Sequence, residues 1–512
     1  MTIIDILEAN AKKFPNKIAI AEVKEKEVLE MTWSEVSINS NKFAIQLIND
    51  GFKENDKICI LLDNCLQWIP IFFSIIKIGA IVVPINHYLT IEDIEICLDK
   101  SKCTALITTE KNKTKIKNHI KNKLLFYTLE DYENVTNCNF ELEHFINKKF
   151  PTIDSTKNIS IHFSSGTTGT PKAILHKHSS FVSSGVVELV HHNLSTSDSL
   201  LCVSPLFHMG IKMHWLGILM SGGKLVILNQ KSPKQIISTI HNQKISVCWF
   251  PLPVGYSILE ECISGEIQIS NFNLSKWKLT HMGSQQIPST FVKKWLSIFP
   301  KQHFDISYGL TEAAGPGCIN LGWENISKEN SIGKAGILWE AKIFDENHNE
   351  LCYNETGELA LKGPGIMVEY FNDKEATNNK FYKEWLLTGD LAYKDQDGFI
   401  YISGRKNDMI NYGGINIYPT IVENRIRKHP CINDVAVIGI DNSIYGELVV
   451  AAIELKPNSV VTKNDIKKYC LNFPYYEIPR KILFMNLPRN SLGKVDKNVL
   501  KKIIKQEVNY DD

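Results

Sequence analysis

The sequence has no long uninterrupted apolar run and no excess of charge of either sign. Its most apolar window, residues 68–85, is interrupted by Pro70, Lys77, Gly79 and Pro84. A membrane-spanning helix needs about 20 consecutive apolar residues, so the window predicts a buried helix followed by a buried strand and no membrane span. The 57 lysine and arginine residues nearly balance the 56 aspartate and glutamate residues, which argues against nucleic acid or an anionic membrane surface as a partner.

Paired cysteines and an export signal are also missing. The 12 cysteines are scattered without a C-x-x-C pair, which in a chain of this length indicates reduced, mostly buried thiols rather than disulfide or zinc-binding cysteines. The N-terminal segment carries Asp5 and Glu8 where a signal peptide has an unbroken apolar core, so it predicts an amphipathic helix and no export. We therefore expect a cytoplasmic protein.

The order of apolar runs predicts an α/β protein with more than one domain. A chain of 512 residues exceeds the size at which one hydrophobic core keeps growing. Short β-branched runs alternate with helical stretches between residues 57 and 108 and again between 199 and 250, a pattern typical of buried parallel strands. Shorter strands of alternating polarity after Gly357 predict a β-rich subdomain. From about Asp408 onward, helix, strand, strand and helix predict a compact unit of roughly 100 residues.

One loop combines glycine and hydroxyl side chains with a single lysine. The stretch "SSGTTGTPK", residues 164–172, follows the apolar run "ISIHF". Glycines let backbone N–H groups converge on a phosphate, hydroxyls add donors, and lysine supplies charge. A Walker A loop requires G-x-x-x-x-G-K-[ST], whereas Pro171 precedes the lysine here and Ala173 follows it, so a P-loop NTPase fits poorly. From this stretch alone, a polar surface turn remains an alternative.

The same loop resembles the phosphate-binding signature of the adenylate-forming enzymes, which include acyl-CoA synthetases, nonribosomal adenylation domains and firefly-type luciferases. The resemblance continues in order through "LLDNC", "KIGAIVVPIN", "PLFHMG", "GSQQIP", "YGLTE", "WLLTGD", "YISGRKNDMINYGGINIYP" and "LPRNSLGK". The chain is therefore similar to AMP-forming acyl-CoA synthetases. Several fragments also resemble the crotonobetaine/carnitine-CoA ligase or medium-chain acyl-CoA synthetase branch, which belongs to fatty acid metabolism.

The resemblance implies a domain arrangement. Residues 1–404 would form a large N-terminal domain of layered α/β subdomains plus a β-rich subdomain, and residues 408–512 a small mobile α+β domain. Residues 405–407 would form the hinge, where this chain has Asn407 in place of the usual Asp or Lys. Rotation of the small domain would present Gly413 and Gly414, whose missing side chains leave room for a pantetheine arm. A plain turn is the alternative for this glycine pair alone.

The resemblance also implies a site for ATP and Mg²⁺. The residues assigned to the phosphates and the metal are Ser164, Ser165, Gly166, Thr167, Thr168, Gly169, Lys172, Thr311 and Glu312. The residues assigned to the adenine and the ribose are Gly283, Ser284, Gln285, Tyr308, Asp390 and Arg405, and Gly309 is assigned to nucleotide binding in general. In this arrangement the loop closes over the β- and γ-phosphates, Thr311 contacts the α-phosphate, and Glu312 holds Mg²⁺ together with Ser164.

The main catalytic cation implied by the resemblance is Lys494 in "NSLGK". In the family this lysine reaches the substrate carboxylate and the α-phosphate when the small domain is closed. Taken alone, Lys494 could equally be a solvated lysine. His208 in "PLFHMG" stands where the family places an aromatic residue or a histidine beside the substrate carboxylate, and a core histidine satisfied by backbone is the alternative.

The acid itself is constrained only in part. The resemblance implies that the acid pocket draws on stretches around "FHMGIKMHWLG", "FPLPVGYS", "HMGSQQ" and "AAGPGC". Residues 208–213 lack the aspartate that pairs with an α-ammonium group in amino-acid-activating domains, which disfavours an α-amino acid. Lys212 and His214 interrupt the apolar helical stretch. They could contact a polar or anionic group of the acid, but we expect both to face solvent.

Three functions remain open at this point. The leading hypothesis is an ATP-dependent acid:CoA ligase of the AMP-forming type, whose partners are a small carboxylic acid and CoA. The second is a freestanding adenylation enzyme that loads an acyl or aryl acid onto the phosphopantetheine of a carrier protein. The third is a catalytically inactive nucleotide-binding regulator, against which the retention of Lys172, Glu312, Asp390, Arg405 and Lys494 argues.

Overall fold

The structure is a computed structural model that describes residues 1–119, 124–138, 150–164, 171–229, 232–283, 285–322, 327–412, 415–442, 445–490 and 493–508. Its internal contacts divide the chain into two compact units. Unit 1 comprises Met1–Ser327, Gly333–Glu340 and Lys362–Leu386, and unit 2 comprises Lys328–Ile332, Ala341–Leu361 and Leu387–Asp512. Unit 2 thus contains the two ends of the predicted β-rich segment together with the predicted small domain, whereas Lys362–Leu386 of that segment belongs to unit 1. The hinge at residues 405–407 and the domain boundaries around it stay a prediction.

One sheet of unit 1 is parallel at its centre and antiparallel at both edges. Its strand order is β15-β14-β13-β12-β11-β9-β10-β1-β2, and every neighbouring pair from β13 to β1 runs parallel. The strands are β1 (Ile18–Val23), β2 (Val28–Thr32), β9 (Ser199–Cys202), β10 (Lys224–Leu228), β11 (Val247–Phe250), β12 (Leu279–Gly283), β13 (His303–Leu310), β14 (Gly315–Asn320) and β15 (Lys334–Ala335). The runs that predicted buried parallel strands between residues 199 and 250 form β9, β10 and β11.

A further sheet of unit 1 has the order β18-β8-β7-β4-β3-β5-β6, with parallel pairing from β7 to β6. Its strands are β3 (Lys57–Leu61), β4 (Ile81–Pro84), β5 (Ala105–Thr108), β6 (Leu125–Thr128), β7 (Asn158–Ser164), β8 (Lys172–Lys177) and β18 (Glu369–Tyr370). The apolar window 68–85 forms the buried helix α3 (Trp68–Lys77) followed by the buried strand β4, as predicted.

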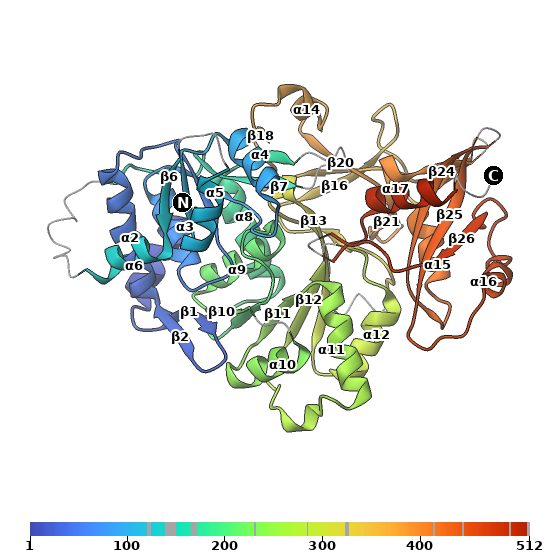
Figure 1. The fold of residues 1–512 in the computed structure, drawn as a ribbon, viewed down its shortest axis with the longest axis horizontal. Coiled ribbons are helices and arrows are strands. Elements are labelled where there is room, and N and C mark those ends of the chain that lie inside the picture. The colour runs from blue at the N-terminus through green and yellow to red at the C-terminus, as the bar shows by residue number, and fades with distance from the viewer. Residues whose placement is uncertain are drawn as a thin grey trace. The chain divides into compact units, whose positions relative to one another are not determined.

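Helices pack on both faces of these sheets (Figure 1). They are α1 (Ile3–Lys13), α2 (Trp33–Asn49), α4 (Ile91–Ser101), α5 (Glu110–Lys117), α6 (Leu129–Asn137), α8 (His178–His191), α9 (Met209–Ser221), α10 (Pro233–Asn242), α11 (Leu252–Ser264), α12 (Ser289–Ile298) and α14 (Lys374–Asn378). Strand side chains alternate between the faces: Leu200 and Cys202 join the core that contains α3, α8 and α9, whereas Leu201 and Val203 join the core under α10, α11 and α12. These layers confirm the predicted α/β class.

Local sequence signals fix several helix starts. Thr2 caps α1 by accepting a hydrogen bond from the Asp5 N–H, and the Asp5 side chain accepts one from the Thr2 N–H in return. Thr32 and Glu35 form the same reciprocal cap on α2. Such capping boxes satisfy N–H groups that have no partner within the helix. The N-terminal segment is therefore the amphipathic helix that the sequence predicts, with Ile3 and Leu7 buried.

The segments of unit 2 form most of one sheet and all of another. The first has the order β16-β17-β20-β19, with β21 paired to β20, and the second has the order β23-β22-β25-β24, with β26 paired to β25. The strands are β16 (Glu340–Phe344), β17 (Gly357–Lys362), β19 (Phe381–Tyr382), β20 (Trp385–Lys394), β21 (Ile400–Arg405), β22 (Ile410–Tyr412), β23 (Ile415–Ile417), β24 (Ile432–Asn442), β25 (Gly446–Leu455) and β26 (Lys481–Phe484). The helices that cover the second sheet are α15 (Pro419–Ile426), α16 (Lys463–Cys470) and α17 (Lys497–Val508).

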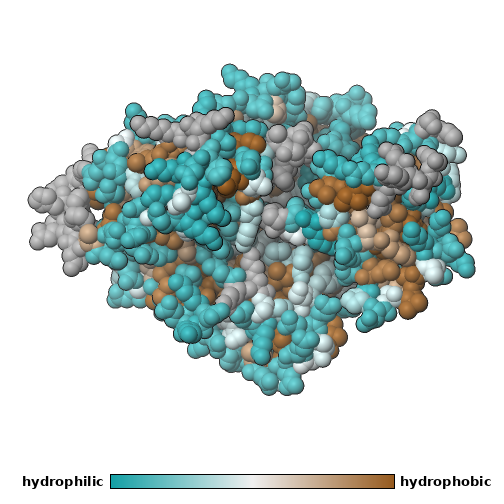
Figure 2. Space-filling model, viewed as in Figure 1, coloured by the Kyte–Doolittle hydropathy of each residue, from teal (hydrophilic) through white to brown (hydrophobic). Residues whose placement is uncertain are grey.

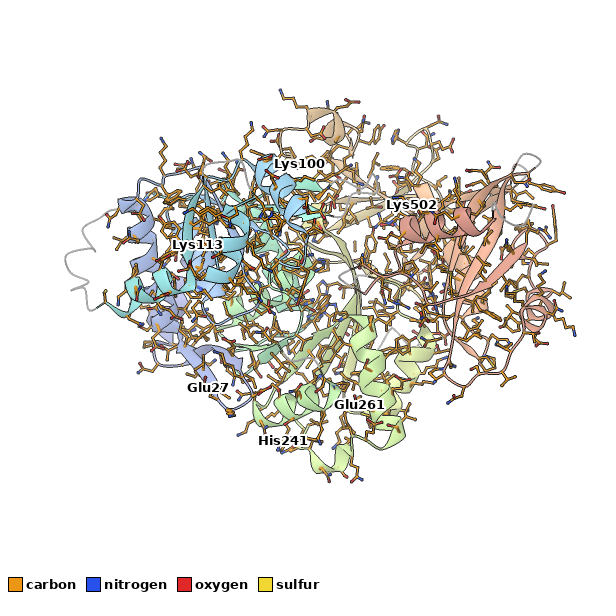
Figure 3. All side chains as sticks on the ribbon, viewed as in Figure 1. Glu27, Lys100, Lys113, His241, Glu261 and Lys502 are labelled. Carbon is orange, nitrogen blue, oxygen red and sulfur yellow. The ribbon has the colours of Figure 1, made fainter. Side chains whose placement is uncertain are left out.

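The surface carries charges of both signs. Glu27, Lys100 and Lys502, which Figure 3 labels, are all exposed. On the face shown in Figure 2, hydrophobic residues form separate patches among hydrophilic ones. Within the described parts of the chain, no helix has both the length and the apolar character needed to cross a membrane. All 12 cysteines lie among the described residues, none of them forms a disulfide, and seven of them are buried.

Candidate active site

The predicted phosphate loop joins two antiparallel strands of unit 1. Strands β7 and β8 pair so that Ser164 lies directly opposite Lys172, and both residues are half-buried. The loop positions between them, Ser165, Gly166, Thr167, Thr168, Gly169 and Thr170, lie outside the described residues. The Lys172 ammonium group lies 4.7 Å from the centroid of the Tyr370 ring, so its charge is held over an aromatic face at the base of the loop.

Tyr370 connects this lysine to Glu312. Its hydroxyl donates a hydrogen bond of 2.8 Å to Glu312 Oε1, and the Met367 N–H donates to the Glu312 backbone carbonyl at 2.7 Å. Burial and the Glu312 carboxylate together raise the pKa of the Tyr370 hydroxyl, so it remains a donor at neutral pH. Tyr370 was not among the predicted site residues. Its motif "EYF" carries no distinguishing signal, because its partner is 58 positions away in the sequence.

A single turn positions Thr311 and Glu312. The 3-10 helix η2 (Thr311–Ala313) follows β13 and ends at Ala314, whose φ of 52° lies in the left-handed region. His176 Nε2 lies 2.9 Å from the Thr311 carbonyl, to which it donates because the carbonyl can only accept. Burial lowers the pKa of His176 to about 4, so the ring is neutral at physiological pH. The turn that carries the predicted phosphate and metal residues is therefore anchored from β8.

Glycine is required where β13 meets β14. A Cβ atom on Gly309 would lie 2.4 Å from the Gly315 carbonyl oxygen, and the strand register shifts between Tyr308 and Gly309. Such an irregularity redirects the side chains that follow it. Gly283 ends β12 in a comparably tight place, because a Cβ atom there would lie 2.8 Å from the Ser307 carbonyl oxygen. The predicted nucleotide-binding residues Gly283, Tyr308 and Gly309 thus lie at the ends of neighbouring strands. Gln285 follows and is half-buried, and Ser284 lies outside the described residues.

His208 caps the N-terminus of α9. Its Nδ1 accepts a hydrogen bond of 3.1 Å from the Gly210 N–H, so a neutral His208 ring carries its proton on Nε2. This hydrogen bond to a backbone N–H agrees with the alternative in which His208 is a core histidine satisfied by backbone. It also fixes the ring, and the role of His208 beside a substrate carboxylate stays a prediction.

Asp390 and Arg405 meet in unit 2. They occupy opposite positions in the antiparallel pairing of β20 and β21, and Arg405 Nε lies 2.7 Å from Asp390 Oδ1. The Asp390 side chain is 7% exposed, whereas that of Arg405 is 52% exposed. Gly389 precedes Asp390 within β20 and has a φ of 79°, and its N–H donates to Glu358 Oε1 at 3.0 Å. The motif "TGD" therefore lies within a strand that presents a buried, oriented carboxylate.

Lys494 lies in the same unit, close enough for the charges of Asp390 and Arg405 to shift the pKa of its amine. Burial and the neighbouring Arg405 lower the pKa of Lys494 to about 8, and Asp390 partly opposes that shift. A tight turn holds its backbone, since the Lys494 N–H donates to Asn490 Oδ1 at 3.1 Å and the Asn490 N–H donates to the Lys494 carbonyl at 2.8 Å. The sequence-predicted trio of Asp390, Arg405 and Lys494 is thus brought together.

The predicted hinge and the glycine pair are described only in part. Asn407 lies in the 3-10 helix η3 (Lys406–Asp408) directly after β21, and Lys406 forms an ion pair of 3.0 Å with Glu358. Gly413 and Gly414 lie outside the described residues. Their proposed contact with a pantetheine arm stays a prediction.

The expectation that Lys212 and His214 face solvent is wrong. Lys212 is 0% exposed and His214 is 3% exposed. The Lys212 amine lies 4.8 Å from the ring centroid of Trp68 and 5.0 Å from that of Phe72, and it has no hydrogen-bond partner among the described residues. Burial holds the pKa of Lys212 well below its usual range. Both residues are buried because α9 is covered by other elements along most of its length.

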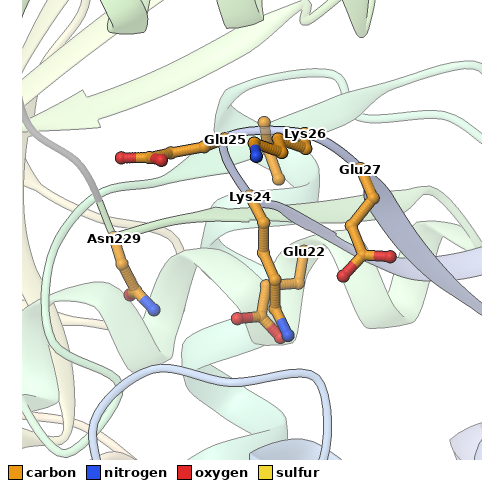
Figure 4. A pocket seen from close by; sticks show the side chains of 7 residues that line it. Glu22, Lys24, Glu25, Lys26, Glu27 and Asn229 are labelled. Carbon is orange, nitrogen blue, oxygen red and sulfur yellow. The ribbon is translucent and has the colours of Figure 1, made fainter.

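A surface pocket in unit 1 lies at the turn between β1 and β2. It is lined by Glu22, Val23, Lys24, Glu25, Lys26, Glu27 and Asn229 (Figure 4). Glu22 accepts a hydrogen bond of 3.0 Å from the Leu66 N–H, and Asn229 donates one of 2.6 Å to the Asn64 carbonyl. These two groups hold neighbouring loops in place, and no sequence-predicted site residue lines the pocket.

Comparison with known proteins identifies the class to which this fold and these residues belong. Residues 7–371 match the family described as AMP-binding enzyme. Residues 421–494 match the family described as AMP-binding enzyme C-terminal domain. The chain belongs to the AMP-binding enzyme family, which confirms the resemblance to the adenylate-forming enzymes. The more specific branch suggested by sequence fragments stays a prediction.

Similar curated proteins are named as CoA ligases. The chain is 29% identical to the acyl-CoA ligase sidI of Aspergillus fumigatus over 83% of this chain and 76% of that protein. It is 26% identical to the long-chain-fatty-acid–CoA ligase FadD13 of Mycobacterium tuberculosis over 93% of both chains. It is also 26% identical to the 2-succinylbenzoate–CoA ligase of Bacillus mycoides over 90% of this chain and 91% of that protein.

Solved structures share the fold over the whole length. The ATP-bound MatB of Rhodopseudomonas palustris superposes with a TM-score of 0.88 at 20% identity and 99% coverage of both chains. The o-succinylbenzoate CoA synthetase MenE of Bacillus subtilis, solved with ATP and a magnesium ion, has a TM-score of 0.85 at 25% identity, covering 97% of this chain and 99% of that chain. The likeness in fold therefore covers the segments of both unit 1 and unit 2.

Proposed function

We propose that the protein is an ATP-dependent acid:CoA ligase of the AMP-forming type. The observation that carries the proposal is the meeting of Asp390, Arg405 and Lys494 in one unit of a chain that belongs to the AMP-binding enzyme family. The names of the three curated relatives reported above, each a CoA ligase, support the same function.

The chemistry explains why these groups coexist. A carboxylate resists attack by a thiol because oxide would have to leave, so it must first be activated. In the proposed first step a carboxylate oxygen attacks the α-phosphorus of ATP, the bond to the β-phosphate oxygen breaks, and pyrophosphate leaves. In the second step the thiol sulfur of CoA attacks the acyl carbon, its proton is lost, and AMP leaves. Both steps build negative charge that fixed cations stabilise.

Lys494 supplies the catalytic cation in this proposal. With a pKa of about 8, the amine is mostly protonated at neutral pH and is available to neutralise charge on the α-phosphate and the attacking carboxylate. Asp390 accepts hydrogen bonds from the ribose hydroxyls, with one of its oxygens oriented by Arg405. Lys172 neutralises the outer phosphates from the base of the loop, where Tyr370 supports it.

The unit 1 residues fit a magnesium ion. Glu312 offers a carboxylate and Ser164 a hydroxyl, and oxygen donors of this kind are what Mg²⁺ prefers. The Tyr370 hydroxyl orients the carboxylate through Oε1. When bound, Mg²⁺ lowers the repulsion that the phosphates present to an incoming carboxylate. The solved structure of MenE with ATP and a magnesium ion supports the use of Mg²⁺ together with ATP.

In this proposal, acyl transfer requires the small domain to rotate into a second position. Rotation at residues 405–407 would withdraw Lys494 and bring Gly413 and Gly414 toward the acyl carbonyl. Asn407 would set the rate of that exchange without preventing it, because a hinge needs only backbone rotation. CoA is the proposed acceptor, and the phosphopantetheine of a carrier protein is the competing one.

Acid-dependent pyrophosphate release tests the proposed function. Purified protein is incubated with ATP and Mg²⁺ and a panel of carboxylic acids, and the best acid is then offered with CoA or with a purified carrier protein bearing phosphopantetheine. We expect pyrophosphate release that depends on both an acid and Mg²⁺, followed by thioester formation on CoA. Pyrophosphate release with thioester on the carrier protein alone would establish the competing acceptor, and no acid-dependent release with any acid would contradict the function.

A further inference from the structure

A cluster of ionisable side chains is buried in unit 1, and none of the roles proposed above uses it. It consists of Glu188, His192, His214, His281 and Asp305, each at most 7% exposed. Among the described residues, no lysine or arginine pairs with the carboxylates of Glu188 and Asp305, and the ion-pair partners of these two carboxylates are histidines only. Buried charges of this kind are normally paired or bound to a metal.

The fold brings these residues together from four elements. Glu188 lies on α8, and His192 stands four residues later, at its C-cap, so both face the same side. His281 and Asp305 are opposite partners in the pairing of β12 and β13. Strand alternation turns them to the same face as Leu279, whose core contains residues of α8 and α9. His214 completes the cluster from α9.

Helices α8 and α9 approach closely at the cluster. A Cβ atom on Gly217 of α9 would lie 2.6 Å from the Glu188 Cβ. Glycine at this position therefore lets the Glu188 side chain enter the space beside His214. A larger residue would push α8 away and disperse the cluster.

The distances centre on one carboxylate oxygen. Glu188 Oε2 lies 2.7 Å from His214 Nδ1, 2.9 Å from His192 Nδ1 and 3.9 Å from His281 Nδ1. The rings of His214 and His281 stand nearly perpendicular, with centroids 4.5 Å apart. On the far side, His192 Nε2 lies 3.2 Å from Asp305 Oδ2.

Several polar atoms of the cluster are left without partners. Among the described residues, Glu188 Oε1, His214 Nε2 and both ring nitrogens of His281 have no hydrogen-bond partner, and each of these atoms is closed to solvent. A neutral imidazole always carries one donor and one acceptor, so hydrogen bonds within the cluster do not satisfy His281. Because solvent does not reach these atoms, a bound metal ion would give them the partner that they lack.

We propose that Glu188, His214 and His281 bind a divalent transition-metal ion, most suitably zinc. One ligand atom from each residue lies within 4.8 Å of the others. Bonds of about 2.0 to 2.2 Å to one nitrogen or oxygen from each require ligand atoms roughly 3.4 Å apart in a tetrahedron, so small side-chain rotations suffice. Imidazole and carboxylate ligands suit zinc among the common ions.

His192 and Asp305 would then form the outer layer of the site. Ligands of a metal are commonly held by an imidazole or a carboxylate behind them, and His192 bridges Glu188 to Asp305 in this way. The ion would tie α8 and α9 to β12 and β13. Those strands end at Gly283 and at Tyr308 to Leu310, so the metal would brace the residues assigned to the adenine without touching the substrate.

Metal content of the untagged protein tests this proposal. Protein expressed with added zinc and washed with a weak chelator should retain about one equivalent of zinc per chain by elemental analysis. His214→Asn and His281→Asn should each reduce the retained zinc to less than about a tenth of an equivalent. His303→Asn, which changes an exposed histidine on the same strand as Asp305, should retain the wild-type amount.

A second measurement does not depend on how the variants fold. Wild-type protein is stripped with a strong chelator and titrated with Zn²⁺ or Co²⁺ at low concentration. Zinc should restore a higher melting temperature, because an ion that binds only the folded chain stabilises it, and cobalt should give the visible absorption of a tetrahedral site. The proposal would be overturned if wild-type protein contained no metal and took up neither ion. The side chains of the cluster would then be joined by hydrogen bonds alone. Either result is independent of whether the protein ligates CoA.

Discussion

Arg405 holds the buried carboxylate of Asp390 through a contact of 2.7 Å between Nε and Oδ1, across the pairing of β20 and β21. The two residues are 15 positions apart in the sequence, and the strand register alone places them opposite each other. Arg405 is half-exposed whereas Asp390 is buried, so the arginine serves the orientation of the carboxylate more than the stability of the fold.

Replacing Asp390 should weaken ATP binding without destabilising the fold. Asp390→Ala removes the proposed acceptor of the ribose hydroxyls, and Arg405 can turn to solvent, so the melting temperature should change little. We expect the KM for ATP to rise at least about tenfold, the equivalent of one hydrogen bond to a charged group. Steady-state pyrophosphate release at varied ATP measures it. Asp441→Ala, which removes an exposed carboxylate paired with Lys505, is the matched control, and an unchanged KM for ATP in Asp390→Ala would show that Asp390 does not bind the nucleotide.

Removing the Lys494 ammonium group should slow adenylation and spare nucleotide binding. We expect Lys494→Ala to lower acid-dependent pyrophosphate release by about 10² or more, the scale for losing one fixed electrostatic donor, while calorimetry still detects ATP binding. Lys502→Ala, an exposed lysine on α17, serves as control. Near-normal pyrophosphate release from Lys494→Ala would remove it from the catalytic role.

The pH dependence of adenylation should report the same lysine. The folded pKa of Lys494 is lowered to about 8, and only the protonated amine can neutralise the phosphate, so kcat/KM should fall as the pH rises through 8. This profile belongs to the free enzyme. Lys494→Arg, whose guanidinium stays protonated throughout, should be slower but should lose that decline. A decline that persists unchanged in Lys494→Arg would assign it to another group.

The Tyr370 hydroxyl should lower the Mg²⁺ concentration that half-maximal activity requires. Tyr370→Phe removes the hydroxyl that donates to Glu312 Oε1 but keeps the ring beneath Lys172. The carboxylate then loses its orientation, and we expect the Mg²⁺ concentration for half-maximal activity to rise about tenfold. A magnesium titration of pyrophosphate release checks this against Tyr353→Phe, which alters an exposed tyrosine. Identical titrations for wild type and Tyr370→Phe would exclude a role for the hydroxyl.

Lys212 should destabilise the fold. Its amine is fully buried without a hydrogen-bond partner among the described residues, so Lys212→Met, which is similar in shape, should raise stability by about 1 to 3 kcal/mol at pH 7. The folded pKa lies below the unfolded one, so the unfolded chain binds the extra proton and the wild type gains stability as pH rises toward 10.5. The advantage of methionine should therefore shrink with increasing pH in thermal denaturation. A lower melting temperature for Lys212→Met at every pH would show that the amine has a stabilising partner.

The sequence predicted the elements whose signal is local. The window 68–85 gave α3 and β4 because a run that is apolar on every side must be buried, and Pro84 marks its end. The α/β class followed from the alternation of such runs. Asp390, Arg405 and Lys494 were found through ordered motifs, since neither composition nor periodicity distinguishes them from surface charges.

Contacts between distant segments could not be predicted in the same way. Lys212 was expected at the surface because a charged residue in an amphipathic helix normally marks the solvent side, yet α9 is buried along most of its length. Tyr370 and Glu312 meet only because β18 pairs with β8. The cluster around Glu188 draws on four elements, and no single stretch of sequence carries its pattern.

The identity of the nucleotide product tests the central claim most directly. Wild-type protein is incubated with ATP, Mg²⁺, CoA and the most active acid, and the products are separated by chromatography. We predict that AMP, pyrophosphate and an acyl-CoA thioester form in equal amounts and that AMP is absent when the acid is omitted. Formation of ADP and phosphate in place of AMP and pyrophosphate would contradict adenylation and the account built on it.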